Sequence, residues 1–492
     1  MISRAPRLAG LLLVASSLLL SACSSPGPIL PTSTPEATVQ PASNATPLPT
    51  RGPHPPGELV PYRAQNGDTL PGVAAHFNTS VGEILDANLG LSPDTTTLAP
   101  GMALEIPAYY LPLTGTPFQI MPDSEVIYGP TAKDFDFRLE LLSHPGYVKD
   151  AADYAYRIDR PAWQVIEIIA RNYSLNPRLL MAILEYGSSG LTDPFPDDQV
   201  KNFPVGHVDD RYRGLFRQLL WAAERLNDGY YGWRSGSLRE FETVDGMLYR
   251  PDSWQNAGTV AVQMLLAGLH DSDEFEHAIG PQGFISTFQD LWGNPFDRAA
   301  DLIPAQLTQP SLGLPFAPDR IWDFTGGPHF SWGTSLPMGA LDFAPPAEET
   351  GCIPSEEWVT APASGVIIRS DEAIVELDLD GDGYGGSGWV LFFFHMAEDN
   401  RIAEGERVQP GDLLGHPSCE GGRSTGTHFH LARRYNGEWF SAAGAVPFVL
   451  DGWVADGADE PYEGTLTKGS KVVPACTCST QDNRILYELP EG

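Results

Sequence analysis

The sequence predicts a multidomain α+β protein, because the pattern of apolar residues changes along the chain. Residues 60–108 have the order strand, helix, helix, strand, and residues 118–305 contain long helical stripes. Residues 313–450 consist of short β-prone runs that glycine and proline interrupt. We therefore expect a small βααβ module, a mostly α domain and a mainly antiparallel β domain, followed by an acidic tail at 451–492.

Residues 1–23 have the features of a secretory signal. Arg4 and Arg7 precede an apolar run from Leu8 to Leu20, which is too short to span a membrane. The run ends in "LSAC", which resembles the lipobox of bacterial lipoproteins. This resemblance implies that Cys23 is acylated and that lipid anchors the protein to the membrane in the cell envelope, outside the cytoplasm. An ordinary secretory signal with a coincidental cysteine is the alternative.

Residues 24–58 are rich in Pro, Ser and Thr and have little to bury, so we expect an extended tether. The formal net charge of −33 argues against nucleic acid or an anionic membrane surface as a partner. Apart from Cys23 the chain has four cysteines, and an even number outside the cytoplasm indicates disulfides. We favour Cys352–Cys419, since both lie in one expected domain, while Cys476 and Cys478 could pair locally.

Residues 62–107 carry three ordered motifs, "NGDTL", "ILDANLG" and "LAPGMALEIP". Asp68 and Thr69 can cap a first helix, and Ser80 can cap a second. The motifs resemble the LysM module over its full length. This resemblance implies binding to glycans that contain N-acetylglucosamine, such as peptidoglycan. The alternative is a small αβ spacer, which three ordered matches disfavour.

The region 118–305 has several helix starts, with Asp159 before Pro161 and Asn176 before Pro177. The stretch "YSLNPRLLMAILEYGSSG" resembles the first conserved block of lytic transglycosylases and other lysozyme-like domains. This resemblance implies a lysozyme-like helical fold.

The catalytic glutamate of that block would fall on Gly187, however, and Glu185 points about 200° away round the helix. We therefore expect this domain to be non-catalytic. Its aromatic residues could line a glycan groove or belong to the core: Tyr230, Tyr231 and Trp233.

The stretch "GTHFHLARR" carries the main candidate for chemistry. On a strand, His428 and His430 project to one face, with the phenylalanine between them on the other. Two imidazoles favour a divalent metal, chiefly zinc, but a catalytic zinc usually takes three protein ligands. Further candidates are His329, Asp342 and His395, which ends an apolar strand. For an isolated His-x-His pair, surface or packed histidines would be the favoured alternative.

With these residues in order, residues 313–450 resemble the zinc endopeptidases of the lysostaphin and beta-lytic class, the M23-like peptidases, which cut peptidoglycan peptides. The short lysostaphin spacing would need a histidine where Met338 stands, four residues before Asp342. The beta-lytic branch has its histidine in a "GGxH" context further upstream, and "GGPHFSWG" places His329 thirteen residues before Asp342.

The resemblance implies that zinc is held by His329, Asp342 and His430, and that His428 and His395 are catalytic. Zinc polarises a scissile carbonyl and lowers the pKa of its water towards ~7. One neutral histidine can accept a proton, and the other can stabilise the oxyanion or protonate the amine. The sequence does not assign these two roles.

Two other features favour simpler interpretations. Asp378, Asp380 and Asp382 alternate like the start of a calcium loop, but Trp389 occupies the position of its closing glutamate. We expect a polar hairpin without specific calcium. His416 in "LLGHPS" is expected to be a turn residue.

The sequence thus predicts a surface-anchored zinc endopeptidase that hydrolyses peptide bonds of peptidoglycan and is targeted by the LysM module. Its partners would be peptidoglycan and, through Cys23, the membrane. The alternative is a catalytically inactive lipoprotein that binds the cell wall or activates another hydrolase. A third hypothesis, glycan cleavage by the middle domain, lacks a candidate acid. For the tail 451–492 the sequence suggests no function.

Overall fold

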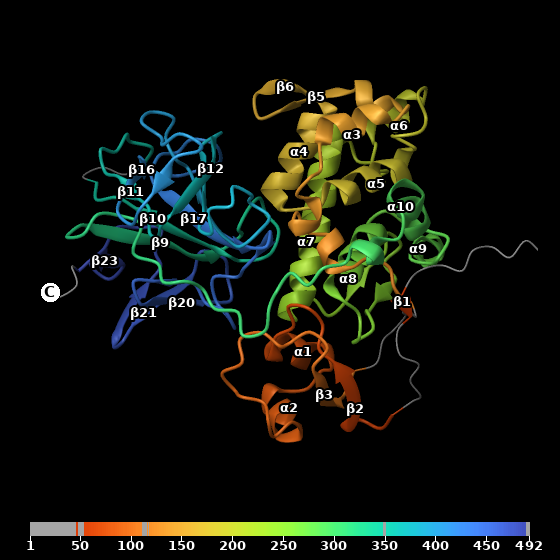
Figure 1. Ribbon diagram of the computed structural model, residues 1–492, viewed down its shortest axis with the longest axis horizontal. Coiled ribbons are helices and arrows are strands. Elements are labelled where there is room, and N and C mark those ends of the chain that lie inside the picture. The colour runs from red at the N-terminus through yellow and green to blue at the C-terminus, as the bar shows by residue number, and fades with distance from the viewer. Residues whose placement is uncertain (1–45, 48–53, 111–115, 117, 348–350, 489–492) are drawn as a thin grey trace, which may run out of the picture. The chain divides into compact units, whose positions relative to one another are not determined.

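The computed structural model describes residues 46–47, 54–110, 116, 118–347 and 351–488 (Figure 1). The predicted signal peptide, its Cys23 and nearly all of the predicted tether lie outside these residues. Within the described ranges, no helix has both the length and the apolar composition that a membrane crossing needs. The combination of helical and antiparallel β regions confirms the predicted α+β class.

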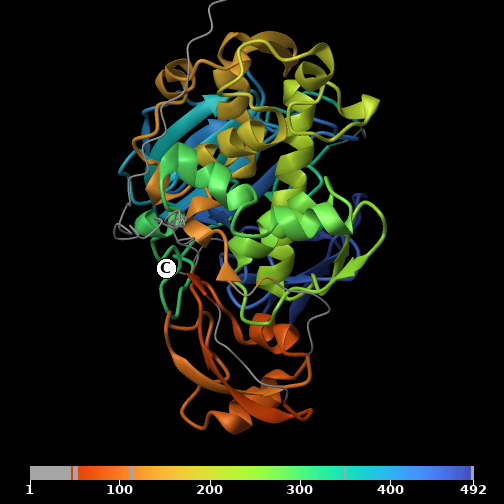
Figure 2. The ribbon, with the colours of Figure 1, turned by 90° about the vertical axis from the view of Figure 1, so that its right-hand side faces the viewer.

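The LysM-like region has the predicted order of strand, helix, helix, strand, and its two strands pair antiparallel (Figures 1 and 2). Thr69 caps the first helix by accepting from the Gly72 N–H, and Ser80 forms a capping box with Glu83 on the second. Asp68 does not act as a cap but accepts from the Tyr62 hydroxyl at 2.6 Å. The elements are β2 (Glu58–Arg63), α1 (Leu70–His76), α2 (Val81–Ala87) and β3 (Ala103–Ala108).

The last residue of α1 is buried against the helical region. The His76 ring stacks on Trp233 with centroids 3.9 Å apart, and its Nε2 lies 2.8 Å from the Trp233 carbonyl oxygen. Burial lowers the pKa of His76 to about 4. Neutral imidazole is therefore the form that this interface accommodates.

We expect His76 to make the folded protein less stable in acid. Its folded pKa of about 4 lies below the ordinary 6.5, so between these values the unfolded chain binds a proton that the folded chain does not. The contribution of His76 to the free energy of unfolding is at most about 3 kcal/mol. It is present above pH 6.5 and is lost as the pH falls towards 4. His76→Gln should lack the dependence, as urea unfolding of both proteins at about pH 7 and about pH 5 will measure. Asp68, whose burial raises its pKa to about 6, titrates in both proteins and cancels in the comparison.

The middle region is a helical bundle with three small strand pairs (Figure 1). Its helices are α3 (Phe137–Ser143), α4 (Ala162–Tyr173), α5 (Pro177–Ser188), α6 (Asp198–Asn202), α7 (Leu215–Ser235), α8 (Ala257–Ala267), α9 (Ser272–Ala278) and α10 (Phe284–Trp292). The paired strands are β1 (Thr46–Pro47) with β4 (Phe118–Gln119), β5 (Ala152–Ala155) with β6 (Ile158–Pro161), and β7 (Phe241–Glu242) with β8 (Leu248–Tyr249).

The helix starts follow the prediction in one case and differ in the other. Asn176 caps α5, with Pro177 at its first position, as predicted. Asp159 does not cap α4, because it lies in β6 opposite Tyr154. Pro161 has extended backbone angles and stands at the N-cap position instead. The β5–β6 hairpin therefore takes up the residues that the sequence pattern assigned to the helix start.

The middle region contains no glycan groove at the predicted aromatic residues. Tyr230, Tyr231 and Trp233 are 0%, 3% and 2% exposed, so they belong to the core. Glu185 accepts from the Leu191 N–H and the Thr192 hydroxyl, and it thereby holds the chain where it leaves α5. The expectation that the middle domain is non-catalytic stays a prediction.

The C-terminal region is built on one large antiparallel sheet. Its strands, in spatial order, are β15 (Arg407–Val408), β12 (Gly365–Asp371), β13 (Ile374–Asp378), β14 (Trp389–Phe394), β17 (Phe429–Tyr435), β10 (Ala340–Ala344), β9 (Ile321–His329) and β23 (Arg484–Leu486), with β18 (Glu438–Trp439) paired to β17. A two-stranded pair lies apart from it, β11 (Val359–Thr360) with β16 (Leu413–Gly415).

The two faces of this sheet have different neighbours. Phe429 and Leu431 of β17 belong to the core of the β region itself. Ala432 on the other face, together with Phe392 of β14, belongs to the hydrophobic cluster that includes the helices. His430 lies on this second face, opposite Phe394 in the β14–β17 register.

Residues 451–488 of the acidic tail are part of the fold. The tail strands β20 (Trp453–Gly457), β21 (Gly464–Lys468) and β22 (Lys471–Pro474) form a second sheet with β19 (Val449–Leu450), which precedes the tail. After it, β23 pairs with β9 at the edge of the large sheet. Both suggested disulfides are present, Cys352–Cys419 and Cys476–Cys478.

The aspartate-rich segment between β13 and β14 is a hairpin loop, as expected. Asp378 accepts from the Gly383 N–H at 2.9 Å, and Asp382 pairs with Lys133 of the helical region at 3.1 Å. The first bond stabilises the loop itself, and the second connects it to the helical region. The expectation of no specific calcium stays a prediction.

Candidate metal centre

Three neighbouring strands bring the predicted metal ligands together. His329 is the last residue of β9, and Asp342 of β10 lies in register with His430 of β17. The register also places Asp342 beside Gly326, where a Cβ would lie 2.7 Å from the Asp342 carboxylate oxygen. Gly326 is therefore needed for the carboxylate to fit between the strands.

One atom of each candidate ligand points to a common centre. His329 Nε2 lies 3.0 Å from His430 Nδ1 and 3.2 Å from Asp342 Oδ1, and His430 Nδ1 lies 3.5 Å from Asp342 Oδ1. All three residues are buried. The predicted ligand set thus forms a compact triangle inside the protein.

Backbone carbonyls fix the tautomers of both histidines. His329 Nδ1 lies 2.9 Å from the Gly327 carbonyl oxygen, and His430 Nε2 lies 3.0 Å from the Ser331 carbonyl oxygen. A carbonyl oxygen can only accept, so these ring nitrogens carry the hydrogens. His329 Nε2 and His430 Nδ1 therefore turn their lone pairs toward the centre.

These residues fit a zinc ion. Two lone pairs face each other across 3.0 Å, and Asp342 Oδ1 is buried without a hydrogen-bond partner. Such an arrangement is unfavourable unless a cation lies among the three atoms. Ligands about 2.1 Å from a tetrahedral zinc are separated by about 3.4 Å, which the observed 3.0–3.5 Å approach.

The pKa values of His329 and Asp342 depend on each other. Burial alone would raise the pKa of Asp342, but the neighbouring His329 holds it well below its usual value. Burial alone would lower the pKa of His329, but the Asp342 carboxylate raises it. The Asp342 carboxyl is therefore ionised.

The two predicted catalytic histidines lie beside the triangle. His428 Nε2 is 3.7 Å from Asp342 Oδ2, and the His428 and His395 ring centroids are 4.6 Å apart. The Gly426 carbonyl lies 2.8 Å from His428 Nδ1, and the Glu420 carbonyl lies 2.7 Å from His395 Nδ1. Both Nε2 atoms thus keep their lone pairs.

His395 is held in an unusual conformation. Its φ of +63° is uncommon for a residue with a side chain, and such positions concentrate at functional sites. Burial lowers its pKa to about 3, so the imidazole is neutral. All five predicted site residues therefore gather in one place. His416 does not join them, because it packs on Trp358 and its Nδ1 lies 2.9 Å from the Glu357 carbonyl oxygen.

The five residues line a cavity of about 1110 Å³. One wall comes from residues 344–347 and 351–357, and a second comes from residues 422–428. The Cys352–Cys419 disulfide joins these two segments near their ends. The tail supplies a third wall through Tyr462 and residues 477–479. The cavity therefore requires segments from both ends of the β region.

Tyr462 is a site residue that the sequence did not reveal. Its ring stacks on His329 with centroids 4.2 Å apart and an angle of 20° between the planes. It lies in the acidic tail, and no spacing or motif connects it with the histidines. The Tyr462 backbone bonds directly to β9, since its N–H donates to the Pro328 carbonyl at 3.2 Å and its carbonyl accepts from the Gly327 N–H at 2.9 Å.

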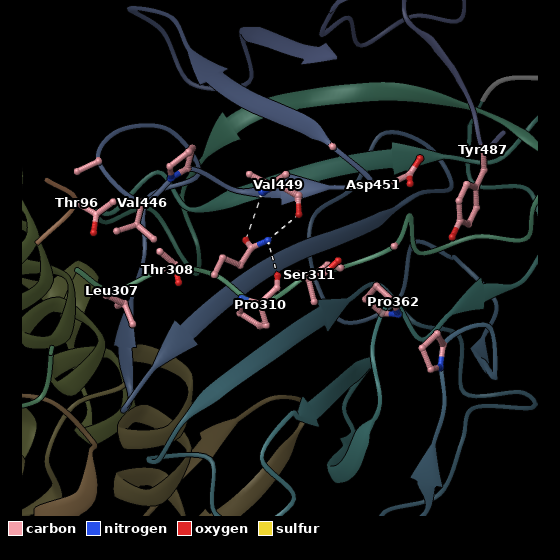
Figure 3. A pocket seen from close by; sticks show the side chains of 17 residues that line it. Thr96, Leu307, Thr308, Pro310, Ser311, Pro362, Val446, Val449, Asp451 and Tyr487 are labelled. Carbon is pink, nitrogen blue, oxygen red and sulfur yellow. Dashed lines mark hydrogen bonds between the residues drawn. The ribbon is translucent and has the colours of Figure 1, made fainter. Parts of the chain in front are cut away.

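A second cavity, of about 660 Å³, lies elsewhere and contains none of the predicted site residues (Figure 3). It is lined by residues 307–313 and by parts of the β region near Val449 and Asp451. Gln309 donates to the Val449 carbonyl at 2.6 Å, and Asp451 accepts from Lys468 at 2.8 Å. Its lining contains no histidine, so this cavity does not offer the ligand set of the histidine site.

Two family models match the chain. The LysM domain matches residues 62–107, and the model described as LasA, N-terminal domain, matches residues 119–306. The middle region is therefore similar to the N-terminal domain of LasA. Its resemblance to lysozyme-like domains stays a prediction.

Similar proteins are peptidases by name. Protease LasA of Pseudomonas aeruginosa PAO1 is 26% identical over 366 residues, which cover 70% of this chain and 78% of that protein. The beta-lytic metalloendopeptidase of Achromobacter lyticus is 27% identical over 165 residues, which cover 32% of this chain and 41% of that protein. The solved structure of the deep-sea M23 metalloprotease pseudoalterin is 25% identical in sequence. The match covers 34% of this chain and 96% of the pseudoalterin chain, with a TM-score of 0.29.

Proposed function

We propose that this LasA-like peptidase of the M23 family, which also carries a LysM domain, hydrolyses peptide bonds of peptidoglycan with zinc held by His329, Asp342 and His430. The observation that carries the proposal is the convergence of two imidazole lone pairs and one unpartnered carboxylate oxygen at 3.0–3.5 Å. The names of the similar proteins support the peptidase activity. An inactive relative would not need this buried ligand set.

Zinc bound at these three residues would act as a Lewis acid on the scissile carbonyl and would make water nucleophilic near neutral pH. The chain itself supplies the proton acceptors. His428 and His395 each have Nδ1 on a backbone carbonyl and both line the cavity, so a neutral imidazole of this pair can take a proton at Nε2 from the attacking water and return it to the leaving amine. Tyr462 holds the His329 ring in place by stacking on it.

We further propose that the protein works in the cell envelope, anchored by lipid at Cys23, with its LysM domain directing it to the glycan of peptidoglycan. The match to the LysM domain and the sequence of the signal region support this localisation. The net charge of −33 fits a partner that is held by hydrogen bonds and stacking rather than by a basic surface.

The direct test uses the chain from about residue 57 onward, loaded with zinc and incubated with purified peptidoglycan. We expect mass spectrometry to find new peptide ends that disappear with a zinc chelator and return when zinc is restored. Intact peptides would favour the inactive, wall-binding alternative. Cleaved sugar bonds without cleaved peptides would place the activity in the middle domain.

A further inference from the structure

The loop that joins β9 to β10 connects two of the candidate zinc ligands. It covers residues 330–339, between His329 and Asp342. Its Ser331 supplies the carbonyl that fixes the tautomer of the third ligand, His430, at 3.0 Å. The position of this loop therefore bears on all three ligands.

The loop holds Ser331 through its own backbone. The Ser331 N–H donates to the Pro337 carbonyl at 3.0 Å, and the Ser331 hydroxyl donates to the same carbonyl at 3.1 Å. Trp332, the next residue, packs on Phe392 and Phe394 with centroids 5.6 and 4.9 Å apart. The position of Ser331 therefore depends on Pro337, on the far side of the loop, as well as on the packing of Trp332.

That far side is held by α7 of the helical region. The Leu336 N–H donates to Asp228 Oδ1 at 2.9 Å, and the Thr334 hydroxyl donates to Glu224 Oε1 at 2.8 Å. Gly333 lies so close to the Tyr173 hydroxyl of α4 that a Cβ would be 2.5 Å away. The donor to Asp228 is the backbone N–H of Leu336, so this hydrogen bond does not depend on a side-chain rotamer of the loop.

We propose that Asp228 is a positioning residue for the zinc site, acting through Leu336, Pro337 and Ser331 on His430. The inference rests on the proposed function, because it assigns the helical region a role in holding that same zinc. Such outer hydrogen bonds orient a ligating histidine and raise its affinity for the metal. The helical region would then help to position the zinc site from outside it.

The test measures the zinc dissociation constant of the full chain, by competition with a chromogenic chelator. Asp228→Ala loses the acceptor for Leu336 and should weaken zinc binding about tenfold. Asp228→Asn keeps an acceptor oxygen and should stay within about twofold of the unaltered chain. Thr334→Val removes the exposed second anchor and should weaken zinc binding less than Asp228→Ala does.

Asp136→Ala is the matched control. Asp136 also accepts one backbone N–H, that of Leu139 at 2.8 Å, but at the start of α3 and away from the loop. A structural role alone would lower the thermal stability in both variants and change zinc affinity in neither. Asp228→Ala with unaltered zinc affinity, or an equal loss in Asp136→Ala, would overturn the inference.

His430→Ala separates this inference from the proposed function. If His430→Ala weakens zinc binding and Asp228→Ala does not, the ligand assignment is supported and only the positioning role of Asp228 is wrong. If His430→Ala binds zinc as tightly as the unaltered chain, the ligand assignment itself fails, and the positioning role fails with it.

Discussion

Replacing His430 with alanine is expected to abolish zinc retention and to lower peptidase activity by roughly a thousandfold or more. His430 Nδ1 is one of three atoms that point to the centre, and its ring is buried. Three protein ligands are the usual minimum for a catalytic zinc. His329→Ala removes a ligand in the same way and should have the same effect.

His416→Ala is the control for this prediction. His416 belongs to the same region and packs on Trp358, but it takes no part in the cavity of the five site residues. We expect the His416→Ala variant to keep both its zinc and its peptidoglycan-cleaving activity. The zinc content is measured by atomic emission after dialysis. If His329→Ala and His430→Ala both retain zinc and activity, the proposed ligand set is wrong.

The sequence predicted the candidate site because its residues follow strand periodicity. His428 and His430 are two positions apart, so a strand places both on one face, and the family resemblance added His329, Asp342 and His395. All five gather around one cavity. Their roles as ligands and catalysts stay predictions that the variants above test.

The surroundings of the site were beyond prediction, since they depend on contacts between distant segments. The tautomers are set by backbone carbonyls, such as that of Ser331. Every residue has a backbone carbonyl, so the sequence does not indicate which ones contact the histidines. Tyr462 reaches His329 because its segment of the tail bonds to the backbone of Gly327 and Pro328 in β9. The sequence does not distinguish Asp228 from the other acidic residues of the helices, because its hydrogen bond to the loop 330–339 depends on the tertiary fold.

In the rest of the fold, local patterns predicted more than long-range packing. Thr69, Ser80 and Asn176 cap helices as expected, because a cap depends on residues two or three positions away. Asp159 was wrongly assigned to a helix start, because pairing with Tyr154 in a hairpin prevailed over its capping preference.

Replacing Arg234 with methionine is expected to destabilise the protein by about 3–5 kcal/mol. Arg234, near the end of α7, pairs with Asp123 of the helical region at 3.0 Å and with Glu438 of β18 at 2.9 Å. It also donates to the Asn66 carbonyl of the LysM domain. All of the charged partners are almost completely buried, so methionine would leave two carboxylates in the interior without a counter-charge.

The double variant Arg234→Met, Glu438→Gln distinguishes this cause from a simple loss of packing. Removing one of the two uncompensated charges should restore part of the stability, whereas lost packing would not be restored. Arg211→Ala is the surface control, because Arg211 pairs with Asp209 but is 83% exposed, and it should change little. Urea unfolding followed by tryptophan fluorescence measures all three variants. Since Arg234 contacts the LysM, helical and peptidase regions at once, a loss as small as that of Arg211→Ala would mean that these regions are held together elsewhere.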